Sequence, residues 1–164
     1  MSKKSLHFII NPISGTGKQE NITSKIEKTI DSSVFETHIH YSERKGHATE
    51  IAKALQSDNV DVIIAVGGDG TVNEIAQSLV NSSTTFGIIP TGSGNGLARH
   101  LGIPQNVTKA LRLINTLNSR KLDSCTANNK FFVNVSGMGY DAHISHCFAK
   151  KRKINAFART SSYS

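Results

Sequence analysis

The sequence predicts an α/β fold of three layers, in which a mainly parallel sheet lies between helices. Short strand-like apolar runs alternate with helix-like segments over residues 6–117, as βαβ connections require. Residues 62–66 are all apolar, which suits a strand covered on both faces. Glycine-rich loops follow three of the expected strands, at the end of the sheet where α/β proteins bind ligands.

Composition and charge limit the class of protein. The chain has 164 residues, of which 37% are hydrophobic and 19% charged, so we expect a globular domain rather than a disordered chain. The net charge of +7 suits an acidic partner: a nucleotide, an anionic membrane or a nucleic acid. Cys125 and Cys147 have no metal or redox spacing, and no apolar run approaches the ~20 residues of a membrane span. The N-terminus lacks the apolar run of a signal peptide, so we expect a cytoplasmic protein.

The first expected strand, residues 6–10, leads into a loop of small residues. Residues 11–18 are rich in Gly, Ser and Thr. This loop is not a P-loop, because Pro12 stands at the position of the first Walker glycine and Gln19 at that of the Ser or Thr. A helix with Ile22, Ile26 and Ile30 on one face is expected to follow.

The second strand–helix pair follows the same pattern. Residues 35–41 alternate apolar or Thr side chains with Glu and His, which predicts a strand. His38 and His40 are expected on a solvated face rather than at a metal site. After a polar turn at residues 42–47, the next helix is marked by Ala48, Ile51, Ala52 and Leu55.

The segment of residues 60–80 is expected to hold the centre of the ligand site. An apolar strand ends at Gly67 and Gly68, and a helical apolar spacing begins at Val72. Thr71 and Glu74 have the spacing of a capping box at the start of that helix. Glycines allow close approach of the backbone to a ligand, and free N–H groups at a helix start favour phosphate oxygens.

Asp69 lies between the glycines of this segment. A carboxylate beside phosphates would be repelled unless it meets Mg²⁺ or a hydroxyl that is to be deprotonated. The alternative is a plain tight turn with a solvated aspartate.

The remaining elements include a second glycine loop and a hairpin. A strand at residues 86–89 leads into the loop of residues 90–99, where Arg99 suits either a phosphate contact or a structural ion pair. Residues 107–117 have the spacing of an amphipathic helix. Residues 120–127 and 131–135 are expected to be strands joined by a turn at Asn128 and Asn129.

Several motifs together resemble the catalytic domain of the diacylglycerol kinase family, which is shared with sphingosine kinases and bacterial lipid kinases. The matching stretches are GGDGTVNE at residues 67–74, NPISG at 11–15, PTGSGNGLA at 90–98, Asp123, FVN at 132–134 and GYDA at 139–142. Gly96 stands where diacylglycerol kinases more often have an aspartate, and the second glycine loop is closer to that of sphingosine kinases, so the lipid stays open.

The resemblance implies an ATP-dependent kinase, with ATP and Mg²⁺ as cofactors, that phosphorylates a hydroxyl of a lipid such as diacylglycerol or a sphingoid base. It implies an ATP-binding α/β lobe at residues 1–122 and the incomplete start of an all-β, lipid-binding lobe at residues 123–164. Asp69 is the expected catalytic residue, and no side chain is assigned as a metal ligand. The expected nucleotide site comprises Asn11, Pro12, Ile13, Ser14, Gly15, Ser42, Gly68, Asp69, Gly70, Thr71, Val72, Asn73, Glu74 and Ser93.

Other interpretations stay open at this stage. The GGDG stretch alone also permits a soluble-substrate kinase similar to NAD kinases. Because the chain stops at Ser164, where the family continues, a non-catalytic nucleotide-binding fragment is a further alternative. Expected partners are ATP, a lipid, an anionic membrane surface contacted by the basic run at residues 150–153, and a second copy of the chain, but no nucleic acid. His143, His146 and Cys147 would share one face of a helix, with too few ligands for a zinc site.

Overall fold

The computed structural model describes residues 2–14 and 21–133. Some expectations therefore lie outside the described residues: Gly15 of the first loop, the turn at 139–142, the basic run at 150–153, and the group of His143, His146 and Cys147. Within the described residues, no helix is both long enough and apolar enough to cross a membrane.

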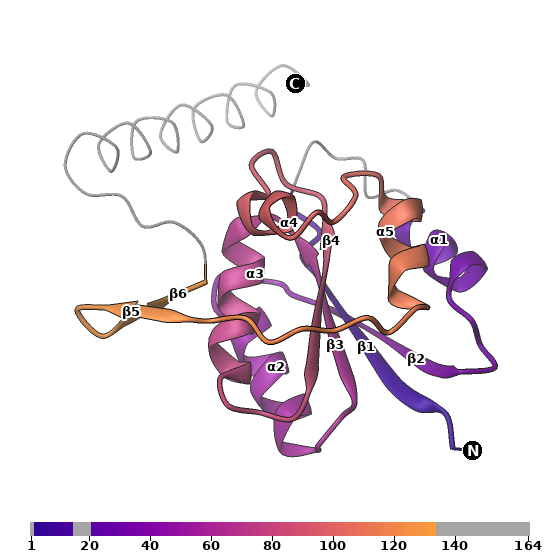
Figure 1. Ribbon diagram of the computed structural model, residues 1–164, viewed down its shortest axis with the longest axis horizontal. Helices are drawn as coiled ribbons and strands as arrows, with labels where there is room; N and C mark the ends of the chain where they lie inside the picture. Colours follow the sequence, from indigo (N-terminus) through magenta and orange to yellow (C-terminus); the bar gives the residue numbers. More distant parts are fainter. Residues whose placement is uncertain (1, 15–20, 134–164) are drawn as a thin grey trace, which may run out of the picture. The chain divides into compact units, whose positions relative to one another are not determined.

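A parallel four-stranded sheet forms the centre of the fold (Figure 1). Its strands lie in the order β2-β1-β3-β4, and all three neighbouring pairs are parallel. The strands are β1 (Lys4–Ile10), β2 (Phe35–Tyr41), β3 (Val62–Gly67) and β4 (Thr85–Pro90). The predicted α/β class with a mainly parallel sheet is confirmed.

Helices cover both faces of this sheet, as Figure 1 shows. They are α1 (Ile22–Thr29), α2 (His47–Ser57), α3 (Asp69–Ala76) with the 3₁₀ turn η1 (Gln77–Leu79), α4 (Gly96–His100) and α5 (Val107–Ile114). One core cluster joins the sheet to α1 and α5, and a second joins it to α2, α3 and α4. Neighbouring β3 residues alternate between them, with Ile64 in the first and Ile63 in the second. Because both faces are covered, all six residues of β3 are buried, as the unbroken apolar run predicted.

The strand order creates a topological switch point between β1 and β3. The chain leaves β1 toward β2 on one side, and then crosses to place β3 on the other side of β1. Loops that leave adjacent strands in opposite directions open a crevice at the carboxyl ends of those strands, where α/β proteins bind ligands. The residues that follow β1 and β3 here are those of the two motifs at Asn11 and Gly68.

The predicted capping box of α3 is wrong. The helix begins at Asp69, earlier than expected, with Gly68 rather than Thr71 at the N-cap and no side-chain cap. The carbonyl of Gly68 accepts the N–H of Val72, which makes Thr71 an interior residue of the first turn. The Thr71 hydroxyl and the Glu74 carboxylate are therefore not needed at the helix start, and each bonds to another segment instead.

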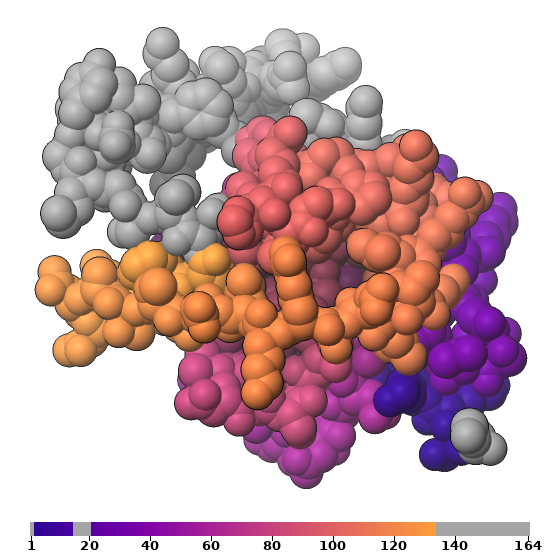
Figure 2. Space-filling view, in the orientation of Figure 1, coloured from indigo at the N-terminus to yellow at the C-terminus, as the bar shows by residue number. Residues whose placement is uncertain are grey.

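The hairpin expected near the end of the described chain is present but shorter. Strands β5 (Cys125–Ala127) and β6 (Lys130–Phe132) pair antiparallel. Asn128 and Asn129 have φ values of 49° and 60°, as a tight two-residue turn with two left-handed residues requires. The strand expected from residue 120 begins only at Cys125, which pairs with Phe132, the last residue of β6. Residues 118–124 are exposed and without regular structure, and Figure 2 shows this orange segment crossing the visible face of the domain.

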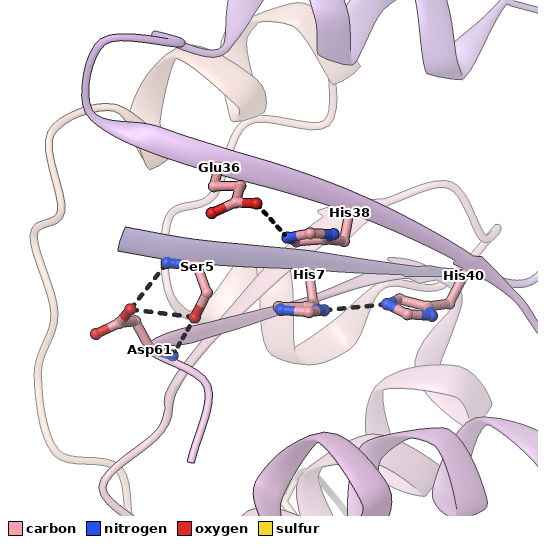
Figure 3. A network of polar contacts seen from close by, with 6 residues as sticks. All are labelled: Ser5, His7, Glu36, His38, His40 and Asp61. Carbon is pink, nitrogen blue, oxygen red and sulfur yellow. Dashed lines mark hydrogen bonds and ion pairs between the residues drawn. The ribbon is translucent and has the colours of Figure 1, made fainter. Parts of the chain in front are cut away.

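Three histidines gather on one face of β1 and β2 (Figure 3). His7 is 8% exposed, and its ring stacks on those of His38 and His40 at centroid distances of 4.5 and 5.3 Å. His7 Nδ1 and His40 Nε2 are 3.0 Å apart and share a hydrogen bond. The pKa of His7 is lowered from 6.5 to about 4, first by burial and then by repulsion from His38 and His40.

The expectation that His38 and His40 face water is therefore only partly right. Both are half-buried, because the parallel register places His38 opposite His7 and on the same face of the sheet. Burial also lowers the pKa of His40. Within residues 2–14 and 21–133, no group of His, Cys, Asp and Glu side chains is arranged to hold a metal ion.

Candidate functional site

Three loops meet at the carboxyl end of the sheet, at the switch point of the strand order. They follow β1, β3 and β4. The sheet pairing continues by one residue into two of them: the Asn11 N–H donates to Val66 O at 3.0 Å, and the Thr91 N–H donates to Gly67 O at 3.0 Å. The three loops therefore start from one rigid edge.

The first loop is tied to both of the others by side chains. Asn11 Oδ1 accepts the N–H of Ile13 at 3.0 Å, and Asn11 Nδ2 donates to Thr71 Oγ1 in α3 at 3.0 Å. Ser14 Oγ donates to Asn11 O at 2.9 Å and lies 3.1 Å from Thr91 Oγ1 in the third loop. These bonds join the loop after β1 to the start of α3 and to the glycine loop after β4.

The second and third loops touch through their glycines. A Cβ placed on Gly92 would lie 2.6 Å from Gly68 Cα, which is closer than real Cβ contacts come. A Cβ on Gly68 would lie 3.3 Å from Gly92 Cα. The absence of side chains at these two positions is what lets the backbones approach so closely, so both glycines serve the packing of the two loops.

Asp69 joins the start of α3 to the start of α4. Its Oδ1 accepts the N–H of Gly96 at 2.7 Å, and its Oδ2 accepts the N–H of Asn95 at 2.9 Å. A Cβ on Gly94 would lie 2.7 Å from the same Oδ2. The residue itself is exposed, so the carboxylate is fixed by two backbone donors while its surface stays open to solvent.

Asn95 is a site residue that the sequence reasoning did not single out. It is 6% exposed and has a left-handed backbone with φ 53°. Its Oδ1 accepts the N–H of Gly92 at 3.0 Å, and its Nδ2 donates to Gly92 O at 2.7 Å and to Gln105 Oε1 at 2.9 Å. The usable signal was an asparagine among glycines, because asparagine adopts the left-handed region more readily than most residues.

Other expected site residues point elsewhere. Val72 is buried in the core cluster of α2 and α3. Asn73 Nδ2 donates to Phe131 O of the hairpin at 3.3 Å, and a carboxylate oxygen of Glu74 accepts the N–H of Gly46 before α2 at 3.1 Å. All three residues lie within α3. Ser93 is exposed in the third loop.

Two more expected residues flank the cluster. Ser42 is buried at the end of β2, where its N–H donates to Ile10 O at 2.9 Å. Arg99 Nε donates to Gly94 O at 2.8 Å, so this side chain supports the third loop, and no ion pair of Arg99 occurs within the described residues.

Beside the first loop lies a hollow of about 490 Å³ lined by Pro12, Asn21, Ile22, Thr23, Ser24, Glu27 and Tyr41.

Comparisons with known proteins agree with this architecture. The family model described as "Diacylglycerol kinase catalytic domain" matches residues 5–127. A diacylglycerol kinase of Bacillus subtilis (strain 168) is 32% identical over 153 residues, which are 92% of this chain and 50% of that protein. A diacylglycerol kinase of Staphylococcus aureus (strain JH9) is 33% identical over 155 residues, with 92% and 49% covered.

Solved structures give the same result. A putative diacylglycerol kinase from Bacillus anthracis str. Sterne superposes with a TM-score of 0.71 at 34% identity, over 79% of this chain and 47% of that one. A second structure of a putative diacylglycerol kinase from that strain gives a TM-score of 0.68 at 33% identity, with 79% and 48% covered. The chain spans about half the length of the curated relatives it matches. By its motifs, its fold and these matches, the chain belongs to the diacylglycerol kinase catalytic domain family.

Proposed function

We propose that this chain is the nucleotide-binding part of an ATP-dependent lipid kinase, which transfers the γ-phosphate of ATP to the hydroxyl of a lipid such as diacylglycerol or a sphingoid base. The observation that carries the proposal is the convergence of three loops at the switch point, with Asp69 held at their centre by two backbone amides. Membership of a family that uses ATP supports the choice of nucleotide. The 32% identity to a bacterial diacylglycerol kinase supports the lipid acceptor.

The loop cluster suits the phosphates of a nucleotide. Glycines at positions 68 and 92 leave no side chain between the backbone and a ligand, and the exposed Gly70 has open space around its Cα. Hydroxyl and amide groups of Asn11, Ser14 and Thr71 lie in the same place. In our proposal these groups hold the phosphates, with Ser93 at the rim.

Asp69 is the proposed catalytic carboxylate. Phosphoryl transfer needs mainly positioning and neutralisation of charge on the phosphates. Mg²⁺ bound with the nucleotide would supply that neutralisation, and an exposed carboxylate with oxygen lone pairs left over from its two amide bonds fits a hard cation. The residue that accepts the proton of the lipid hydroxyl is proposed to lie in the second lobe, whose incomplete start we still place at residues 123–164.

The test compares Asp69→Asn with Gly68→Val in a protein that carries both lobes. Asp69→Asn should keep ATP affinity, measured by calorimetry, and lower turnover of lipid micelles by ~10²-fold or more. Gly68→Val should abolish ATP binding, because its side chain fills the contact with Gly92. Asp58→Asn, an exposed aspartate at the end of α2, is the matched control.

Two results would contradict the proposal. Near-normal lipid turnover by Asp69→Asn would remove this carboxylate from the reaction. Phosphorylation of a soluble dinucleotide, with none of lipid micelles, would favour the NAD kinase-like alternative instead.

Contacts with membranes and with other copies also remain proposals. The exposed Leu122 and the exposed strand β5 offer apolar surface and an open strand edge, and such edges tend to pair with other chains. We expect self-association through the region after Leu122, and sedimentation that shows only monomer at micromolar concentration would contradict it.

A further inference from the structure

Asn95 combines a left-handed backbone with side-chain hydrogen bonds to Gly92 and Gln105. The residue is buried, left-handed, and located directly before the five-residue helix α4. For most side chains the left-handed region is unfavourable, by roughly 1–2 kcal/mol. Asparagine adopts this region more readily than most residues, and here its side chain and its N–H also bond to other segments, among them Asp69.

The left-handed turn directs two successive backbone N–H groups at one carboxylate. The N–H of Asn95 reaches Asp69 Oδ2 at 2.9 Å, and the N–H of Gly96 reaches Oδ1 at 2.7 Å. Each oxygen has its own donor, so rotation of the carboxylate would break both bonds. Hydrogen bonds from amides to a charged carboxylate are among the stronger ones in proteins. The orientation of Asp69 consequently depends on the conformation at position 95.

The Asn95 side chain in turn fixes that conformation from two directions. It bonds to both the N–H and the carbonyl of Gly92, which closes the loop on itself. It also donates to Gln105 Oε1 at 2.9 Å, which lies outside the loop, before α5. Closing the loop needs only the bonds to Gly92. The bond to Gln105 adds an external anchor that sets where the closed loop stands relative to α3.

We propose that Asn95 is the positioning residue for Asp69: with Gln105 as its anchor, it holds the loop after β4 so that the Asp69 carboxylate keeps one orientation toward the reacting phosphate. This inference rests on the proposed function of the site. Asn95 itself is buried and touches no ligand in this scheme. Its effect passes through the two amides at positions 95 and 96.

The experiment uses Asn95→Gly, because glycine keeps the left-handed backbone and removes only the side-chain bonds. Asn81→Gly is the matched control: Asn81 has a φ of 59°, is exposed, and makes no side-chain hydrogen bond within the described residues. In a protein with both lobes, Asn95→Gly should lower kcat by at least ~10-fold, since small misplacements of a reacting group are costly. The KM for ATP should change by less than about threefold, and Asn81→Gly should change neither value.

A double-mutant cycle separates positioning from a general weakening of the loop. If Asn95 acts through Asp69, then adding Asn95→Gly to Asp69→Asn should lower kcat little further. A full additional loss in that background would overturn the inference, as would a normal kcat in the single variant. If Asn95→Gly does not fold, as judged by circular dichroism, then Gln105→Ala takes its place, because it removes the external anchor together with only one other bond, from Gln105 Nε2 to Ile103 O at 3.3 Å.

A second measurement needs no lipid or turnover. In the unsubstituted protein, the amide protons of residues 95 and 96 should exchange slowly with solvent in NMR because they bond to the Asp69 carboxylate, and Asp69→Asn should abolish this protection. Asn95→Gly should weaken it clearly, and unchanged protection would overturn the inference. If the protein phosphorylates no lipid at all, the proposed function fails, while this NMR result still decides whether Asn95 orients Asp69.

Discussion

His7 should make the fold weaker as the solution becomes acidic. Its pKa in the folded protein is about 4, because burial and the neighbouring His38 and His40 disfavour the charged ring, with Asp58 and Glu36 opposing them only in part. An unfolded chain binds the proton near pH 6.5, but the folded chain does not bind it until about pH 4. The unfolded state therefore takes up more protons in this interval, and the free energy of unfolding falls as the pH falls through it.

The size of this effect follows from the two pKa values. A difference of one pKa unit corresponds to about 1.4 kcal/mol, so full titration from 6.5 to about 4 gives an upper limit of ~3 kcal/mol. Between about pH 7.5 and pH 5.0 the same two values give ~2 kcal/mol. His38 and His40 are half-exposed and keep water near the cluster, which weakens the effect. We therefore expect the free energy of unfolding to fall by ~1–2 kcal/mol in that interval because of His7.

The assay is urea unfolding followed by circular dichroism, since the chain has no tryptophan. His7→Leu removes the titrating ring, so its loss of stability between about pH 7.5 and pH 5.0 should be ~1–2 kcal/mol smaller than that of the unsubstituted protein. The substitution His100→Gln, at an exposed histidine in α4 outside the cluster, is the control.

Three carboxyl groups with lowered pKa values act below this interval. They are those of Asp31, Glu50 and Asp61, which accept hydrogen bonds from Ser33, Arg44 and Ser5 respectively. Their stabilising contribution is lost only as the pH falls below their ordinary values of 3.8 to 4.5. If His7→Leu loses as much stability as the unsubstituted protein between the two pH values, the reasoning about the histidine cluster is refuted.

Two further predictions concern stability. Gly92→Ala should destabilise the protein by ~1–3 kcal/mol in urea unfolding, because its Cβ would lie 2.6 Å from Gly68 Cα, whereas Gly70→Ala, with open space around the added Cβ, should not. Asn106→Ala should cost ~1 kcal/mol in the same measurement, because the Asn106 side chain accepts the Lys109 N–H at the start of α5; a change near zero would show that this cap is not needed.

The elements that the sequence predicted well are those in which a local pattern and the final environment agree. Strand β3 is apolar throughout and is covered on both faces, so its pattern and its burial coincide. In α1, Ile22 and Ile26 recur at helical spacing and both are buried. The glycine loops were recognisable because a strand, small residues and a helix follow one another along the chain at each of them.

The features that sequence reasoning missed depend on contacts between distant segments. Thr71 and Glu74 have capping-box spacing, yet Asn11 and Gly46 bind them instead, and only the folded sheet brings these partners near. The buried His7 was missed because a histidine in an apolar strand gives no sign that two others face it from β2. The contacts of Asn95, which lies in an expected nucleotide loop, were missed for the same reason, because its partners Asp69 and Gln105 lie in other elements.

The layer formed by α1 and α5 has a consequence for how the chain reaches its native state. Asn115, just after α5, donates from its side chain to Thr29 O at the end of α1 at 2.8 Å, across 86 residues of sequence. Strands β1 and β2 can pair soon after they leave the ribosome, but α1 then has one flank without its neighbour until α5 has been synthesised. Contacts of such long range slow folding, because loop closure precedes the stabilising contact. A nascent chain that ends before α5 would expose part of its apolar layer to solvent, and chaperone binding should be strongest in that interval of synthesis.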